Sequence, residues 1–343
     1  MSLHPNPPGV PEEPPWLSVL MPAHNAARHL SEAMQSVRSQ LDADAEVIVL
    51  DDGSTDGTAA ILAAEAQLPG PRLRVLRHAS AQGVAAARNR LLDEARGQWL
   101  WFIDADDRLR PGAARTVRRI VQADPRLELV VVDHAVLRPQ PRLKHRLRGE
   151  RHRRSLAGPG GLIDGTPALL GGLLQSAQWH LWGKVVRRNL WPASLRFPQG
   201  RVFEDLALMP LLARQVQRAW YLNEPCIDYR SNPGSILGSM NPSKLQDWAW
   251  VLQQLAADPP SPGAQDPVLA RAWSAHLARQ ALRLAAVARR LERDPVWLTP
   301  WFCSLDQLDP GIRAAMRAWA WQPSRWALRW RAQRLGWMSR PTT

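Results

Sequence analysis

WLWFIDADD, residues 99–107, is the stretch that decides the fold of this chain, because a short apolar run leads there directly into three carboxylates. The apolar part is typical of a buried β-strand. Asp104, Asp106 and Asp107 carry like charges, which repel one another more strongly when buried. A hard divalent metal, which prefers oxygen ligands, would relieve that repulsion and keep coordination positions open for substrate phosphates. The alternative is a solvated acidic turn that closes a strand.

Two upstream stretches have the same pattern. EVIVLDDGSTDGT (46–58) ends an apolar run in Asp51 and Asp52, and LSVLMPAHN (17–25) ends one in a proline and a polar tip. Strands alternating with helices predict βαβ units in a mostly parallel sheet, whose ligands bind at the carboxyl ends of the strands. The expected strands lie near 17–21, 46–50, 72–77 and 99–103, and the expected helices near 27–40, 57–67 and 84–95.

Four ordered motifs make the chain similar to family 2 glycosyltransferases with the GT-A fold, which are inverting nucleotide-sugar transferases. The last motif contains a D-x-D sequence, Asp104-Ala105-Asp106. D-x-D alone is a weak signal, but four motifs on successive βα units are a strong one. The similarity covers roughly residues 16–235, and its motifs are SVLMPAHN, VIVLDDGSTDGT, QGVAAARN (82–89) and WFIDADD.

This resemblance implies an α/β, Rossmann-like GT-A fold: a mostly parallel sheet flanked by helices, with a C-terminal helical appendage. It also implies a nucleotide-sugar site at the strand tips. Asp52 would accept hydrogen bonds from the nucleobase or ribose, and the first strand tip would cradle the base with Pro22, Ala23 and Asn25. UDP-linked sugars are the commonest donors of the family.

For the phosphate end of the donor, the resemblance implies Arg88, Asp104 and Asp106. Arg88 would contact nucleotide or phosphate through its fork of donors. Its alternative is an ordinary surface arginine. Asp104 would hold ribose or metal-bound water, and Asp106 would bind Mn²⁺ or Mg²⁺ directly, so that both carboxylates belong to the metal site.

On the acceptor side, WHLWGKVVRR (179–188) and RVFEDLALMP (201–210) resemble two further family motifs. Trp182 would stack on the acceptor sugar, and Lys184 would reach the donor diphosphate; the alternative for Trp182 is core packing. Asp205, with Glu204 second, would be the general base, a role worth roughly 10²–10⁴ in rate. The alternative for Glu204 and Asp205 is acidity that favours a helix N-terminus.

The resulting hypothesis is a metal-dependent, inverting, non-processive glycosyltransferase. It would move a sugar from a nucleoside-diphosphate sugar to a hydroxyl of a glycan or lipid-linked acceptor, in the assembly of cell-surface polysaccharide. A catalytically degenerate GT-A module that only binds nucleotide or glycan is the second hypothesis. A nucleic-acid binder is the third, and no reading element supports it. The string QPSRW (322–326) matches a motif of processive synthases but lies far from Asp205, and we interpret it as coincidence.

Length and composition predict the domain organisation. The chain has 343 residues and two cysteines, Cys226 and Cys303, which fits a reducing cytosol. No run approaches 18 apolar residues, so no membrane span is expected. We expect a disordered proline-rich tail at residues 1–15, a GT-A domain at 16–240 and a helical region at 241–343.

The net charge of +13 is concentrated in two segments, 138–154 and 311–340. The first suggests a basic flap or insert. The second interleaves arginine with tryptophan, as interfacial membrane anchors do; the alternative is a compositional bias toward Arg, Ala, Pro and Trp. The expected location is therefore the cytoplasm, with peripheral contact to anionic lipid at the inner face of the cell membrane as an open option.

Overall fold

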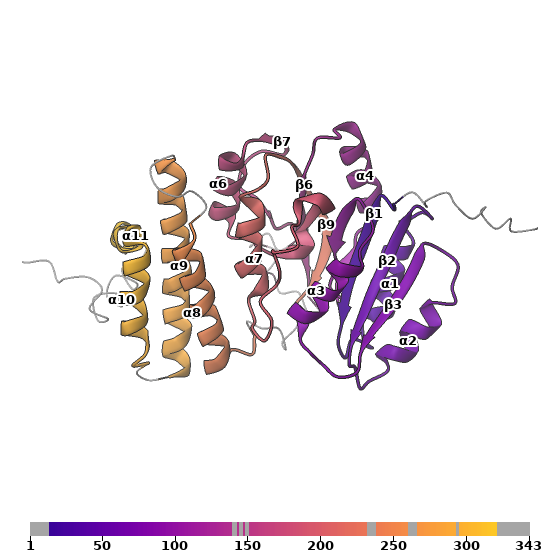
Figure 1. Cartoon of the computed structure of the whole chain (residues 1–343), viewed down its shortest axis with the longest axis horizontal. Helices are drawn as coiled ribbons and strands as arrows, with labels where there is room; N and C mark the ends of the chain where they lie inside the picture. The colour runs from indigo at the N-terminus through magenta and orange to yellow at the C-terminus, as the bar shows by residue number, and fades with distance from the viewer. Residues whose placement is uncertain are drawn as a thin grey trace, which may run out of the picture.

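The computed structural model describes residues 14–138, 151–231, 238–259, 266–292 and 295–320, together with Leu143 and Leu147. A twisted sheet with helices on both faces forms one end of the molecule, and a group of helices forms the other (Figure 1). The mixed α/β class expected from the sequence is confirmed.

The first four strands form the parallel part of the sheet, in the order β3-β2-β1-β4. All eight residues of β2 are buried, whereas β3 at the edge of the sheet is partly exposed. The bounds match the sequence expectation closely, because apolar runs and turn residues are local signals. They are β1 (Leu17–Ala23), α1 (Leu30–Arg38), β2 (Ala45–Asp52), α2 (Thr58–Glu65), β3 (Arg72–His78), α3 (Val84–Glu94) and β4 (Trp99–Phe102).

Beyond β4 the sheet becomes mixed, which corrects the expectation of a mostly parallel sheet for this half. β8 (Lys184–Arg187) lies antiparallel between β4 and β6 (Leu129–Leu137). β9 (Arg218–Arg230) is parallel to β6. The short strands β5 (Arg108–Leu109) and β7 (Gly161–Asp164) are antiparallel to β9. Helix α4 (Ala113–Ala123) follows β5.

Helices α6 (Thr166–Ser176) and α7 (Glu204–Ala213) lie between the sheet and the C-terminal helices (Figure 1). Two 3₁₀ turns, η1 (Leu181–Gly183) and η2 (Arg188–Leu190), flank β8. The C-terminal helices are α8 (Pro242–Ala257), α9 (Pro267–Leu291), α10 (Leu298–Leu308) and α11 (Pro310–Ala320).

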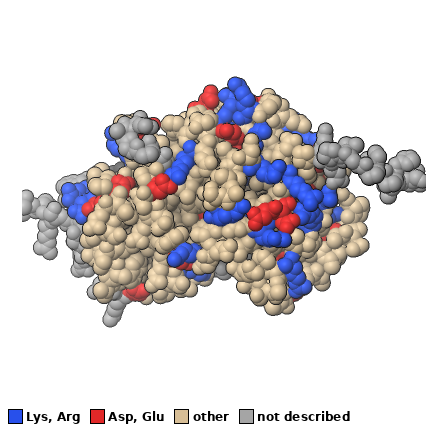
Figure 2. Space-filling model, in the orientation of Figure 1, with Lys and Arg blue, Asp and Glu red and all other residues tan. Residues whose placement is uncertain are grey.

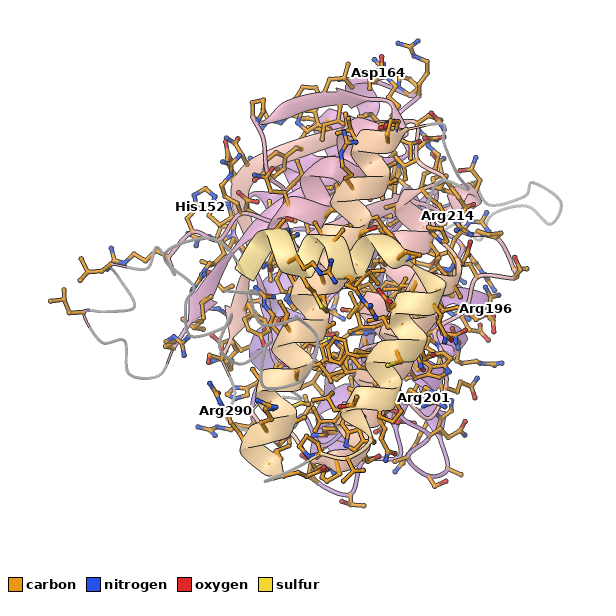
Figure 3. All side chains as sticks on the ribbon, turned by 90° about the vertical axis from the view of Figure 1, so that its left-hand side faces the viewer. His152, Asp164, Arg196, Arg201, Arg214 and Arg290 are labelled. Carbon is orange, nitrogen blue, oxygen red and sulfur yellow. The ribbon has the colours of Figure 1, made fainter. Side chains whose placement is uncertain are left out.

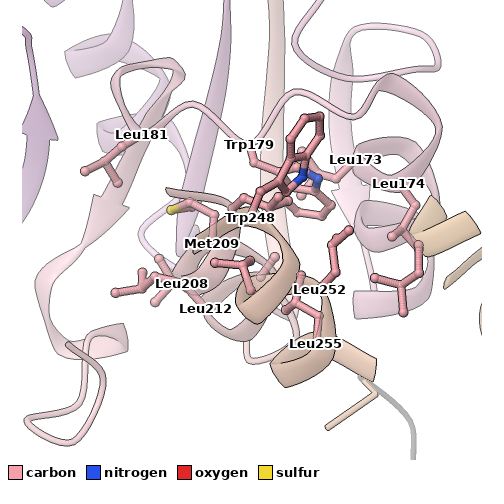
Figure 4. Packing of buried hydrophobic residues seen from close by; sticks show 14 of the residues in the cluster. Leu173, Leu174, Trp179, Leu181, Leu208, Met209, Leu212, Trp248, Leu252 and Leu255 are labelled. Atoms are coloured by element: carbon pink, nitrogen blue, oxygen red, sulfur yellow. The ribbon is translucent and has the colours of Figure 1, made fainter. Parts of the chain in front are cut away.

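The C-terminal helices share one hydrophobic core with α6 and α7. Trp179 and Trp248 pack there among leucines of α6, α7 and α8 (Figure 4). Figure 3 looks along the molecule from the C-terminal end, with α10 and α11 nearest the viewer. Burying an aromatic or leucine side chain contributes about 1.5–3 kcal/mol, so this contact holds α8 and α9 firmly against the rest. The boundary at residue 240 stays a prediction.

Several expectations fall outside the described residues. They concern the first 13 residues, most of the basic segment 138–154, the QPSRW string and the tail from 321 onward. Among the helices that the structure does describe, none has the length and apolar character needed to cross a bilayer.

Candidate functional site

Asp52 lies at the carboxyl end of β2 and anchors the loop that follows β3. Its Oδ1 accepts hydrogen bonds from His78 Nδ1 at 2.7 Å and from the Gln82 amide at 2.9 Å, and its Oδ2 accepts one from the Gly83 amide at 2.8 Å. Burial raises the pKa of Asp52, but these hydrogen bonds outweigh burial and the net pKa is lowered. Asp52 is thus an ionised carboxylate at the start of α3.

The tip of β1 is joined to the tip of β2 by Asn25. The Asn25 amide nitrogen of the backbone donates to Ser54 Oγ, and its Oδ1 accepts from the Thr55 amide, both at 2.9 Å. Asn25 has a left-handed φ of 48°, a conformation that asparagine tolerates better than most residues. Pro22 is half-buried and Ala23 is buried beside it. The residues predicted to cradle the base therefore do lie on one edge of the sheet.

The loop after β4 carries the three carboxylates of the D-x-D segment. Asp107 is buried, and its Oδ1 accepts from the Arg230 amide at 2.7 Å, while Oδ2 has no hydrogen-bond partner. Burial and the neighbouring charges of Asp104 and Asp106 raise the pKa of Asp107 well above its ordinary value. Arg230 also donates from Nε to the carbonyl of Asp106 at 2.9 Å. Contacts with Arg230 of β9 therefore hold the loop in place, and the loop brings three carboxylates close together.

Arg88 joins this loop to helix α7. Its Nη2 lies 3.1 Å from Asp104 Oδ1, and its Nη1 lies 2.6 Å from Glu204 Oε1 and 2.7 Å from Asp205 Oδ1. Only 4% of Arg88 is exposed, so the alternative of an ordinary surface arginine is excluded. The predicted contact with a phosphate stays a prediction, since in this structure the guanidinium pairs three carboxylates.

Glu204 and Asp205 begin α7, directly after Phe203 with a left-handed φ of 66°. This conformation is rare for a large side chain and turns the chain so that both carboxylates meet Arg88. Burial raises the pKa of Glu204 to about 7, although Arg88 opposes the shift. Asp205 is the more accessible of the two, at 19% side-chain exposure against 6% for Glu204. Of the two carboxylates, only that of Asp205 is thus partly open to solvent.

The turn between α6 and β8 holds the second oxygen of the Asp205 carboxylate. Asp205 Oδ2 accepts from the Leu181 amide at 3.1 Å. Lys184, buried in β8, donates from Nζ to the carbonyls of Gln178 and His180 at 2.5 and 2.7 Å. Burial lowers the pKa of Lys184 to about 7. Lys184 is placed to fix this turn, and its predicted contact with a diphosphate stays a prediction.

Trp182 lies inside an aromatic cluster. Its ring stacks on His180, with centroids 4.9 Å apart, and on Tyr229, with centroids 5.5 Å apart, and it meets His134 edge-on. Because only 2% of Trp182 is exposed, the packing alternative describes its position. His180 is exposed and Tyr229 is half-buried. A sugar could therefore reach these two rings more easily than the predicted Trp182 platform.

The donor set of this loop fits a hard divalent cation. Carboxylate oxygens are the ligands that Mg²⁺ and Mn²⁺ prefer, and Mg²⁺ is held by one or two carboxylates plus substrate phosphates. Burial and Asp106 raise the pKa of Asp104 even though Arg88 opposes the shift, and Asp107 Oδ2 and Glu204 Oε2 are buried without a partner. Within the described residues, no group of three or more His, Cys, Asp or Glu side chains forms a ready metal site.

Sequence reasoning predicted Asn25 but missed other residues that support the site. Among the described residues, three non-glycine residues have a left-handed φ: Asn25 and Phe203 border the site, and Ala177 precedes the turn that holds Asp205. No sequence signal marks an alanine or phenylalanine for this conformation. His180 was missed as well, although it lies two residues before Trp182 in WHLWGKVVRR (179–188).

Several acidic side chains on the surface outside the site are paired with arginines. Basic side chains spread over the face shown in Figure 2, and acidic ones gather in small groups among them. On α3, for example, Arg90 pairs with Glu94, and Arg196 pairs with Asp93. Such exposed pairs contribute about 0–1 kcal/mol each, so they do not mark a second site.

The proteins similar to this chain include polysaccharide biosynthesis proteins and glycosyltransferases. ExoO, a succinoglycan biosynthesis protein of Rhizobium meliloti, is 35% identical over 129 residues, which are 38% of this chain and 35% of ExoO. EpsJ, an uncharacterised glycosyltransferase of Bacillus subtilis, is 26% identical over 65% of this chain and 63% of its own length. The matches therefore span between about a third and two thirds of these relatives.

Among solved structures, S. aureus TarS residues 1–349 in complex with UDP-GlcNAc has a TM-score of 0.70 at 17% identity. The alignment covers 94% of this chain and 88% of that one, and it supports a GT-A-like fold over nearly the whole chain. Residues 18–171 match the description "Glycosyl transferase family 2". The family match thus covers the part of the chain that begins at β1 and contains the strand tips and the D-x-D loop.

Proposed function

We propose that this protein is a metal-dependent, inverting glycosyltransferase that transfers one sugar from a nucleoside-diphosphate sugar to an acceptor hydroxyl. One observation carries the proposal. Through Arg88, the D-x-D carboxylate Asp104 and the candidate base Asp205 belong to a single ion network, with contacts of 3.1 and 2.7 Å. The carboxylate proposed to hold the cation and the carboxylate proposed as the base thus share one guanidinium.

The donor end of the site would bind the nucleotide along the tips of β1 and β2. Asp52, Asn25, Pro22 and Ala23 border this edge, and Asp104 and Asp106 would hold the cation. When bound, Mn²⁺ or Mg²⁺ neutralises the charge that develops on the leaving nucleoside diphosphate. UDP-GlcNAc is the first donor to test, because TarS, which shares the fold, has been solved with it.

The acceptor end would supply general-base catalysis. Asp205 Oδ1 faces Arg88 and Oδ2 faces the Leu181 amide, so the carboxylate is oriented from two sides and still 19% exposed. Asp205 would remove the proton of the acceptor hydroxyl as that oxygen attacks the anomeric carbon, opposite the leaving diphosphate. Glu204 is more deeply buried and is the second candidate.

The acceptor we propose is a glycan or a lipid-linked sugar of a cell-surface polysaccharide. Similarity to ExoO and to TuaG, a Bacillus subtilis protein named for teichuronic acid biosynthesis, supports this pathway class. A cytoplasmic location with peripheral membrane contact through the Arg/Trp-rich C-terminus belongs to the same proposal.

Thermal unfolding with nucleotides tests the donor site. UDP, GDP, CDP and TDP are each added with Mn²⁺ or with EDTA, to the wild type and to Asp106→Ala. A ligand at 100 times its dissociation constant adds about 2.7 kcal/mol of stability. We expect one nucleotide to stabilise the wild type only with metal, and this shift to be lost in Asp106→Ala.

The matched control is Asp93→Ala, which removes an exposed aspartate of α3 outside the site. It should keep the whole nucleotide shift. If no nucleotide stabilises the wild type, the donor site is absent and the proposal fails. Nucleotide binding without sugar transfer or donor hydrolysis would identify the degenerate binding module instead.

A further inference from the structure

Arg88 does more than form a structural salt bridge, because this one side chain contacts both the D-x-D loop and the start of α7. Nη2 contacts Asp104 in the D-x-D loop, whereas Nη1 is divided between Glu204 and Asp205 at the start of α7. Its Nε is buried without a partner. Arg88 therefore gives the D-x-D loop one of its two terminal nitrogens and gives α7 the other.

The charges around Arg88 do not balance. One guanidinium faces three carboxylates directly, and Asp106 and Asp107 lie in the same loop as Asp104. Glu204 Oε2 and Asp107 Oδ2 have no hydrogen-bond partner although both are buried. An uncompensated buried carboxylate is costly. The network thus has room for a second positive charge on the D-x-D side.

We propose that Arg88 is a positioning residue that couples cation binding at the D-x-D loop to the orientation of the base. This inference rests on the proposed function. Arg88 and the cation compete for Asp104. When a divalent cation neutralises Asp104, the guanidinium is drawn toward Glu204 and Asp205 and fixes them for the acceptor.

Coupling of this kind must be reciprocal, because each site changes the free energy of the other by the same amount. Removing the Asp205 charge leaves Arg88 to pair more strongly with Asp104, which should weaken cation binding. A direct electrostatic effect of Asp205 on the cation has the same sign. The two effects are separated only by a double-mutant cycle that includes Arg88.

The experiment is a titration of Mn²⁺ alone, followed by electron paramagnetic resonance of the free ion at one fixed pH. Four proteins are compared: wild type, Asp205→Asn, Arg88→Met and the double variant. Arg88→Met alone should tighten Mn²⁺ binding. Asp205→Asn should weaken Mn²⁺ binding more when Arg88 is present than in the Arg88→Met background. The two effects should differ by about fivefold or more, fivefold being the lower end of typical coupling between two sites. Equal effects in the two backgrounds overturn the inference.

Controls separate this coupling from misfolding and from other roles of Arg88. Arg90→Met removes an exposed arginine of the same helix and should leave the Mn²⁺ affinity unchanged. Arg88→Met strips three carboxylates of their partner, so Arg88→Lys serves as the second variant. Lysine keeps the positive charge but lacks the two terminal nitrogens with which the guanidinium contacts both groups. The substitution should therefore abolish most of the coupling in a folded protein.

Titration with UDP and Mn²⁺ together distinguishes the remaining outcomes. If Arg88→Met weakens UDP binding while the cycle with Mn²⁺ alone shows no coupling, Arg88 acts on the phosphates and the inference fails, whereas the proposed function stands. If the wild type binds neither Mn²⁺ nor UDP, the inference and the proposed function fail together.

Discussion

The site has two edges: the strand-tip edge with Asp52, and the α7 edge with Glu204 and Asp205. The pKa of a buried carboxylate is shifted in opposite directions at these two edges. At the strand tips, Asp52 accepts three hydrogen bonds and its pKa is lowered. At α7, Glu204 shares one guanidinium with two other carboxylates, and burial raises its pKa to about 7. At the strand-tip edge the hydrogen bonds of the protein compensate the charge of Asp52. At the α7 edge one guanidinium faces three carboxylates, so negative charge is in excess.

This difference reflects how each edge is built. The strand tips are satisfied by backbone amides of short loops, which a parallel sheet brings together at its carboxyl end. The α7 edge depends on Arg88, on the turn held by Lys184 and on the C-terminal helices behind Trp179. Changes at the strand tips should therefore affect donor binding, and changes near α7 should affect transfer.

The largest expected effect is that of Asp205→Asn on the transfer rate. Loss of the general base should lower the rate of UDP release from a UDP-sugar by roughly 10²–10⁴. The nucleotide-induced thermal shift should be retained, because the strand tips are untouched. Asp93→Asn, an exposed aspartate of α3, is the matched control and should keep full activity. A normal rate in Asp205→Asn would move the base to Glu204.

Glu204→Gln should change the pH dependence of stability. A carboxyl whose folded pKa is about 7 binds more protons in the folded than in the unfolded state between pH ~4.5 and 7, so wild-type stability falls as the pH rises through this range. The glutamine variant lacks this loss and should gain about 1–3 kcal/mol relative to wild type between pH 5 and 8.

Urea unfolding at the two pH values measures the gain. Glu94→Gln, which removes a salt-bridged glutamate from the surface of α3, is the control. A constant difference between Glu204→Gln and wild type at both pH values would show that Glu204 is ionised throughout, and the contrast between the two edges would disappear.

Asp52→Asn should act in the opposite sense on the pH profile. Because the folded pKa of Asp52 is lowered, its charge stabilises the protein above the unfolded value near 3.9, and this contribution is lost as the pH falls through the folded pKa. Replacing a charged acceptor of backbone amides costs about 1.5–3 kcal/mol. The nucleotide shift should also shrink.

Thermal melts at pH 7 and at successively lower pH separate these effects, since the difference between wild type and Asp52→Asn should narrow as the pH falls through the folded pKa of Asp52. Asp44→Asn, at the opposite edge of the sheet, should leave the nucleotide shift intact. An unchanged nucleotide shift in Asp52→Asn would remove the strand tip from the donor site.

The strand tips were largely predictable from the sequence and the α7 edge was not. Apolar runs and turn residues are local, so β1 to β4 and the position of Asp52 followed from them. Arg88 was recognised as a candidate, but its partners Glu204 and Asp205 lie 116 and 117 residues away. Burial of Trp182 and exposure of His180 depend on β6 and β9, which no local pattern relates to this turn.

The smallest expected effect concerns the support behind α7. His276 of α9 is fully buried and its Nε2 lies 3.2 Å from Trp179 Nε1, so it accepts the hydrogen bond of the indole. His276→Phe keeps a ring there but removes the acceptor, which should lower the free energy of unfolding by about 1 kcal/mol.

Trp179 immediately precedes His180 in the turn that orients Asp205. UDP release should therefore slow several-fold while the nucleotide shift stays constant. Ser274→Ala is the control, because Ser274 lies on the same helix as His276 and loses only its own hydrogen bond to Asp309, the residue that ends α10. Equal loss of nucleotide binding and rate in His276→Phe would mean that the two edges are not independent.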